Sequence, residues 1–379
     1  MITRQQISEV VARYDPEGIT IGTLGSHSAL DICRGAKDEH LQTLAVCQKG
    51  REETYDRYYR VRKSFGRICG VIDKTIVLDK FQDILNEDVQ SRLVSMNTVF
   101  VPHRSFTVYV PYDGIEGRFL VPIFGSRSLL RAEERDVERN QHYLLEKAEI
   151  RTPHLFRDYT EIDRLVVVKV GEAERTYERA FFYASSPKEF EERSSELINK
   201  GMITREALST AVIEEFTVGA QYNFNFFYSP LLGELELLGT DARRQTNLDG
   251  LLRLPADEQL KVLEYIKARN IEVGHFATTI RESLLEKVFK LGERFVEATK
   301  EEYPPGIIGP FALQGAVLPG PPKEDIVIFD VSLRVPGSPG TKFTHYTECY
   351  WGLPVSTGRR IAMEVKAAVE EDRLEEVVT

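Results

Sequence analysis

The sequence predicts two structural parts, an α/β part at the N-terminal end and an α+β part after it. In the first part strand and helix patterns alternate along the chain, an order typical of a mostly parallel sheet. In the second part several strand patterns follow one another with few helices between them, as in antiparallel sheets. We place the boundary so that the domains cover residues 1–125 and 126–379.

The elements follow from short apolar runs bounded by Gly, Pro and polar turns. Residues 221–228 alternate polar and aromatic side chains, which is typical of a half-buried antiparallel strand, and residues 132–147 have a helical pattern. The expected strands of the first domain are 19–21, 43–47, 74–78, 98–101 and 119–124. Those of the second are 165–170, 181–184, 211–216, 221–228, 234–239, 307–314 and one that begins at 326.

Composition limits the possible partners. The 379-residue chain carries a net charge of −10, which argues against nucleic acid or an anionic membrane as a general partner. Its four cysteines include no Cys-x-x-Cys pair, so a zinc site or a disulfide framework is not expected. No apolar run has the length of a membrane span. We therefore expect a cytoplasmic protein that binds small molecules.

Polar side chains follow two expected strands of the first domain at their carboxyl ends. His27 lies in a Gly/Ser-rich loop after the first strand, and Ser105 follows the strand at 98–101. Ligands of parallel α/β sheets bind at this edge, so we expect the two to lie together. A single histidine is more often a structural hydrogen-bonding group, and that alternative stays open.

Asp330, Ser332 and Arg334 occupy alternate positions of an expected strand, so their side chains share one face. A carboxylate binds a hard cation and a guanidinium binds phosphate oxygens, so this face suits a metal–phosphate site. Gln314, at the end of another expected strand, offers a second oxygen ligand. An edge strand with one solvated face explains the same pattern.

Lys169 interrupts an apolar strand pattern, LVVVKV. A lysine in this setting often reaches a phosphate group. The alternative is a surface lysine whose aliphatic stem covers apolar residues.

Taken together, these motifs resemble the ATP-grasp ligases, and most closely the archaeal-type, formate-dependent FAICAR synthetases. The resemblance covers nearly the whole chain. It rests on TLGSHSAL at 23–30, KGR at 49–51, VPHRSF at 101–106, FGSR at 124–127, IEEFTVG at 213–219, FYSP at 227–230, ELELLG at 234–239, NLDG at 247–250, IRESLL at 280–285, PPGIIGPFALQ at 304–314 and DVSLRV at 330–335.

The resemblance implies an ATP-grasp fold with an N-terminal Rossmann-like domain and a lid subdomain at about 160–218. It also implies a reaction in which ATP, formate and AICAR give FAICAR, ADP and phosphate. It implies a requirement for Mg²⁺, with Mn²⁺ as an alternative, and a homo-oligomer. Arg334 and His27 are the expected catalytic residues. The resemblance further assigns His27, Ser105, His275 and Asn247 to the ribonucleotide, Lys169, Arg175, Arg179, Glu215, Phe216, Val218 and Gln245 to ATP, and Gln314 and Asp330 to the metal.

Four features depart from the family pattern. The loop at 171–182 has one glycine and three glutamates where the family has a Gly-rich loop, although Arg175 and Arg179 can replace amide contacts. Gln245 stands where a Glu is usual, His275 where an Asn is usual, and Asp330 where a Glu is usual. Two alternatives therefore stay open: a nucleotide-binding paralogue without turnover, and a ligase for a related ribonucleotide or a different acid.

Overall fold

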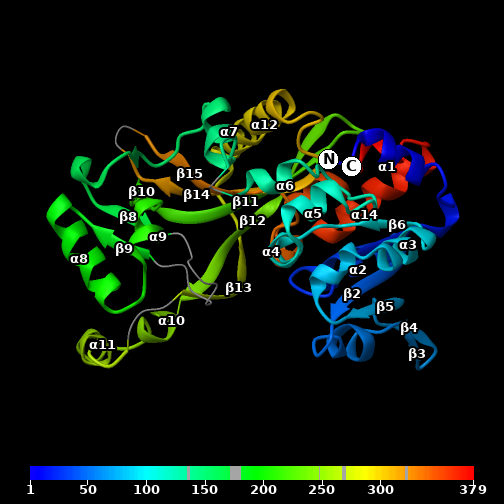
Figure 1. Cartoon of the computed structure of the whole chain (residues 1–379), viewed down its shortest axis with the longest axis horizontal. Helices are drawn as coiled ribbons and strands as arrows, with labels where there is room; N and C mark the ends of the chain where they lie inside the picture. The colour runs from blue at the N-terminus through cyan, green and yellow to red at the C-terminus, as the bar shows by residue number, and fades with distance from the viewer. Residues whose placement is uncertain (135–136, 171–180, 247, 267–269, 321–322) are drawn as a thin grey trace.

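The computed structural model describes residues 1–134, 137–170, 181–246, 248–266, 270–320 and 323–379 (Figure 1). Over these residues it contains one four-stranded parallel sheet, a five-stranded and a four-stranded antiparallel sheet, and a two-stranded hairpin. In Figure 1 the parallel sheet and the two chain termini lie at one end of the molecule, and the smaller antiparallel sheet lies at the other. The long antiparallel strands connect the two ends.

The N-terminal sheet has the strand order β5-β2-β1-β6, and every pairing in it is parallel. The strand β1 is buried at every position, as expected for an inner strand of a parallel sheet that is covered on both faces. The strands are β1 (Thr20–Leu24), β2 (Gln42–Gln48), β5 (Lys74–Leu78) and β6 (Thr98–Phe100), beside the hairpin β3 (Arg62–Ser64) and β4 (Arg67–Cys69). The helices here are α1 (Arg4–Val11), α2 (Ala29–Asp38), α3 (Glu87–Ser95), α4 (Arg104–Tyr109) and α5 (Tyr112–Gly117).

The helix near the C-terminal end, α14 (Thr357–Glu370), packs against α2 of this N-terminal unit (Figure 1). Two glycines let the helix backbones touch. A Cβ on Gly35 would lie 2.0 Å from the backbone nitrogen of Arg359, and one on Gly358 would lie 2.2 Å from the carbonyl oxygen of Asp31. No residue with a side chain fits at either position without separating the helices.

The central sheet has the order β13-β12-β11-β14-β15 and is antiparallel. One face packs on α12 (Leu285–Glu302) through Phe224, Phe226 and their neighbours. The opposite face of β11 is also buried, since Asn225 is fully buried. The prediction of a half-buried strand was therefore wrong. The strands are β11 (Ala220–Ser229), β12 (Glu234–Thr246), β13 (Asn270–Thr278), β14 (Gly309–Leu318) and β15 (Asp325–Ser332), followed by α13 (Tyr346–Trp351).

The smaller antiparallel sheet has the order β7-β10-β8-β9 and its own apolar core under α8 (Pro187–Asn199). Its strands are β7 (Leu155–Phe156), β8 (Val166–Lys169), β9 (Phe181–Ala184) and β10 (Val212–Glu215), with α9 (Arg205–Ser209) beside them. In Figure 1 the helices α10 (Leu248–Leu251) and α11 (Ala256–Leu263) lie below this sheet. The proposed domain and lid boundaries stay predictions.

The helix predicted over 132–147 is wrong as a single element. The structure has α6 (Leu129–Ala132) and a separate α7 (Gln141–Lys147), with described non-helical residues between them. Asn140 starts α7 by accepting hydrogen bonds from the backbone N–H groups of His142 and Tyr143. This interruption places Glu133 beside the end of β15, where its side chain accepts from Leu333 and Arg334 and its carbonyl oxygen accepts from Gln141 of α7.

Candidate functional site at the junction of the parallel and central sheets

The two polar clusters at the carboxyl ends of β1 and β6 meet in the structure, as the strand order predicted. The hydroxyl of Ser105 donates to that of Ser26 at 2.9 Å. The rings of His27 and His103 stack with their centroids 5.3 Å apart. His27 adopts a left-handed backbone conformation with φ of 49°, at the sharp turn between β1 and α2.

His103 is a structural residue of this site. It is fully buried, and its Nε2 lies 2.9 Å from the carbonyl oxygen of Leu24, to which it donates. Its Nδ1 accepts from the backbone N–H of Ser105, so one nitrogen donates and the other accepts. Burial lowers the pKa of His103 to about 4, because the charged ring loses its hydration. The ring is therefore neutral at neutral pH, and it fixes the entry into α4.

His27 is the exposed histidine of the pair. Loss of hydration against the surrounding protein lowers its pKa, and the nearby His103 and Arg334 lower it further. Its Nδ1 lies 2.7 Å from the hydroxyl of Ser28, which in turn donates to the carbonyl oxygen of Pro336. The ring is therefore neutral, with Nδ1 donating and Nε2 available as an acceptor.

His275 lies across from His27 and is held by Asp241. Its Nδ1 is 2.5 Å from Oδ2 of Asp241, whose side chain is almost fully buried on the neighbouring strand β12. Asn223 and Asn225 of β11 donate to the same carboxylate at 2.8 and 2.6 Å. The polar alternation of β11 thus supplies the donors that hold a buried acid in place.

Gly337 separates the two exposed histidines. A Cβ at this position would lie 3.0 Å from Nε2 of His27 and 3.4 Å from Nε2 of His275. The next residue, Ser338, donates to Oδ1 of Asn225 at 2.7 Å, so the loop is tied to the network that holds Asp241. Both imidazoles therefore present Nε2 toward the same loop.

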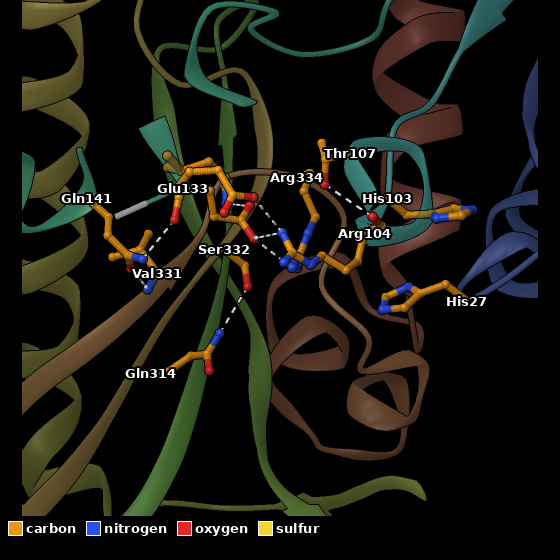
Figure 2. Close-up of polar contacts among 12 residues, drawn as sticks. His27, His103, Arg104, Thr107, Glu133, Gln141, Gln314, Val331, Ser332 and Arg334 are labelled. Atoms are coloured by element: carbon orange, nitrogen blue, oxygen red, sulfur yellow. Dashed lines mark hydrogen bonds and ion pairs between the residues drawn. The ribbon is translucent and has the colours of Figure 1, made fainter. Parts of the chain in front are cut away.

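Arg334 lies beyond the last residue of β15 and is held by Glu133 (Figure 2). Its Nη2 donates to Oε1 of Glu133 at 2.8 Å, and both side chains are less than a tenth exposed. The other carboxylate oxygen accepts from the backbone N–H of Leu333 at 3.1 Å. Arg104 reaches the same carboxylate at 3.6 Å. One acid thus holds two guanidinium groups at the junction.

Gln141 reinforces this arrangement from α7. Its Nε2 donates to the carbonyl oxygen of Glu133 at 2.9 Å, and its Oε1 accepts from the backbone N–H of Val331 at 2.6 Å (Figure 2). The segment that carries Glu133 is therefore fixed to the end of β15 at several points. Neither Glu133 nor Gln141 stood out in the sequence, because both belong to the region predicted as an uninterrupted helix.

Gln314 and Asp330 face each other across β14 and β15. Gln314 donates to the hydroxyl of Ser332 at 3.0 Å, and its carbonyl oxygen accepts from Arg243. Among the described residues no group of three or more His, Cys, Asp or Glu side chains is placed to hold a metal. A carboxylate with an amide oxygen nonetheless fits Mg²⁺, which usually takes one or two protein carboxylates and completes its shell with water and phosphate.

Lys169 lies in the smaller sheet, away from the histidines. Its ammonium group forms an ion pair with Glu214 on the neighbouring strand β10. One carboxylate oxygen of Glu214, Oε2, is buried without a hydrogen-bond partner. This lysine is therefore not the snorkelling surface residue of the alternative interpretation, since only 12 % of its side chain is exposed.

The expected ATP hinge begins at Glu215, the last residue of β10. The side chain of Glu215 accepts from the backbone N–H of His154, Phe216 packs edge-on against Tyr183, and Val218 is exposed. Arg175, Arg179 and Asn247, together with the side chain of Gln245, lie outside the described residues. Their assigned roles stay predictions.

Comparison with known proteins places this arrangement in a family. Two family models match, a domain of unknown function (DUF1297) over residues 189–379 and a protein of unknown function (DUF1246) over residues 21–156. Over its full length the chain is 42% identical to the whole 5-formaminoimidazole-4-carboxamide-1-(beta)-D-ribofuranosyl 5'-monophosphate synthetase of Methanopyrus kandleri. It is 41% identical, again over its full length and 99% of the relative, to the synthetase of the same name from Methanothermobacter thermautotrophicus. The chain belongs to this synthetase family.

Solved structures match the fold of this chain. The crystal structure of an IMP biosynthesis protein PurP from Thermococcus kodakaraensis matches with a TM-score of 0.69 and 31% identity, covering 95% of this chain and 100% of that one. N5-carboxyaminoimidazole synthetase from Staphylococcus aureus matches with a TM-score of 0.57 and 11% identity, over 92% of this chain and 77% of that one. The predicted family and the predicted ATP-grasp fold are confirmed. Of the helices described, none is long and apolar enough to cross a membrane.

Proposed function

We propose that the protein is an ATP-dependent ligase that joins formate to the 5-amino group of AICAR, giving FAICAR, ADP and phosphate. The observation that carries this proposal is the full-length similarity to relatives named as FAICAR synthetases. The meeting of His27, Ser105 and Arg334 at one junction supports it. Such a site suits a ribonucleotide and a phosphorylated acid, whose charges need hydrogen-bond donors and cations.

The residues divide by chemistry. Neutral His27 and Ser105 would bind the ribonucleotide, and Arg334 would bind the phosphate oxygens of formyl phosphate and stabilise the charge that grows as phosphate leaves. Lys169 and the segment from Glu215 to Val218 would hold ATP. Gln314 and Asp330 would hold Mg²⁺, which neutralises phosphate charge during phosphoryl transfer. Exclusion of water from the junction would protect the acyl phosphate from hydrolysis.

The proposal is tested by incubating the purified protein with ATP, Mg²⁺, formate and AICAR and measuring ADP and FAICAR together. We expect one FAICAR for each ADP, and no FAICAR when formate is left out. ADP formation that depends on a different acid or ribonucleotide would contradict the assigned substrates. ATP binding without either product would identify a nucleotide-binding paralogue instead.

Lys169→Met is expected to weaken ATP binding about tenfold to a hundredfold, because a charge-assisted hydrogen bond contributes about 1.5–3 kcal/mol. The measurement is the dissociation constant for ATP by calorimetry. Lys188→Met is a matched control, since Lys188 is a largely exposed lysine on α8. Unchanged ATP affinity in Lys169→Met would show that this lysine serves only as the partner of Glu214.

A further inference from the structure

The hairpin β3–β4 carries an aromatic side chain at its tip. Ser64 pairs with Arg67, so Phe65 and Gly66 form the two-residue turn, and both have a positive φ, of 49° and 74°. Such turns favour Asn-Gly or Gly-Gly, because a bulky residue rarely adopts this backbone conformation. Phe65 is nonetheless fully exposed, so no packing within the chain offsets the strain. An aromatic side chain held out in this way is suited to contact a second surface.

The hairpin is both apolar and basic. Tyr58, Tyr59 and Ile68 are exposed large apolar side chains beside Phe65. Residues 57–68 contain five Lys and Arg and no Asp or Glu, and the net charge stays positive when the three acids at residues 52–56 are included. The whole chain has a net charge of −10, so this surface differs in sign from the rest of the protein. We call residues 57–68 the basic hairpin.

A helix in the connection between β12 and β13 lacks the apolar packing that helices normally have. The helix α11 contains no buried residue, and Leu260 and Leu263 on it are 70 and 46 % exposed. Leu252 before the helix and Ile266 after it are exposed as well. A surface helix usually buries its apolar stripe against a core, so another surface is expected to cover this one. Residues 256–266, the acidic helix segment, contain three acids and one lysine.

The basic hairpin and the acidic helix segment are complementary, since each combines exposed apolar side chains with a charge opposite to that of the other. In Figure 1 the hairpin lies at the end of the molecule that holds the parallel sheet, and α11 lies at the opposite end, beside the smaller sheet. A chain with these surfaces at opposite ends cannot join them to each other, whereas two copies of the chain can.

We propose that the basic hairpin of one copy of this chain packs on the acidic helix segment of a second copy, with Phe65 between the exposed leucines. The contact joins two different surfaces, so it closes either a reciprocal pair or a ring of copies. It would cover the connection between the two strands that carry Asp241 and His275. The contact is independent of the reaction that the protein catalyses.

The test is the molar mass of the full-length protein, measured by sedimentation over a series of concentrations. We expect the unsubstituted protein to self-associate. Phe65→Asp faces the acidic segment and Leu260→Lys faces the basic hairpin, so each should raise the dissociation constant about a hundredfold, as expected for loss of a central apolar anchor. Met202→Asp and Met202→Lys are the matched controls, because Met202 is exposed and lies outside both surfaces, and they should leave association unchanged. Circular dichroism of each variant reports whether it is folded.

A mixture of the two dissociated variants tests the pairing itself. Phe65→Asp keeps an intact helix segment and Leu260→Lys keeps an intact hairpin, so an equimolar mixture should form complexes with one copy of each. Added salt should weaken these complexes, because part of the attraction is between opposite charges. A monomeric unsubstituted protein would overturn the inference, as would unchanged association in either variant or a mixture whose components stay separate.

Discussion

Arg334→Lys is expected to lower kcat/KM for FAICAR formation about a thousandfold, the upper effect of removing one donor that stabilises a developing negative charge. The planar guanidinium can bind Glu133 through Nη2 and still present its remaining N–H groups to phosphate. A lysine has a single ammonium nitrogen, so it cannot bind Glu133 and the phosphate at the same time in the way that the guanidinium can. The measurement is steady-state kinetics of FAICAR formation with saturating ATP and formate.

The matched control is Arg281→Lys, because Arg281 is an exposed arginine that pairs with Glu324 at 2.7 Å. We expect this control to keep its full rate. A loss of less than tenfold in Arg334→Lys would show that a point charge is sufficient, and that the fork of Arg334 is not used in formyl transfer.

Glu133→Ala is expected to destabilise the protein by about 3–5 kcal/mol, the usual cost of leaving a buried charge without its partner. Arg334 would lose its counter-charge in a buried position, and the backbone N–H of Leu333 would lose its acceptor. The difference in unfolding free energy is measured by chemical denaturation of the unsubstituted protein and of Glu133→Ala.

Glu324→Ala provides the comparison, because its pair with Arg281 is exposed and such pairs contribute about 0–1 kcal/mol. Equal stability losses in the two alanine variants would contradict the buried-pair argument. Glu133→Gln has one acceptor oxygen, so it can keep only one of the hydrogen bonds from Arg334 and Leu333 while it loses the charge, and we expect an intermediate loss.

The sequence was sufficient to predict the fold and the meeting of the strand ends. Parallel strands in an alternating order must place their carboxyl ends on one edge, so His27 and Ser105 could be brought together without coordinates. The facing of Gln314 and Asp330 followed in the same way from two neighbouring polar strand positions. The alternation of side chains along each strand and the order of strands along the chain decide such features, and both can be read from a single sequence.

The supporting residues were hidden for physical reasons. Glu133 lies where the structure interrupts a segment whose apolar residues have continuous helical spacing. The spacing of apolar residues alone does not reveal such an interruption. Asp241 and Asn225 look like members of a solvated strand face, because alternation alone cannot distinguish water from a second buried layer. Gly337 matters through what lies beside it in space, two histidines from distant segments.

The contact of α14 with α2 has a consequence for how the chain folds while it is being synthesised. A ribosome that adds about 5–20 residues per second releases the N-terminal sheet long before the residues that pack on α2 exist. Until Gly358 arrives, the surface around Gly35 has no neighbour, and Ile361 and Val365, which belong to the same apolar cluster as Ile32, are still absent. The N-terminal sheet and α2 are therefore expected to be among the last parts of the chain to reach native packing. Until then their exposed apolar surface is expected to bind chaperones.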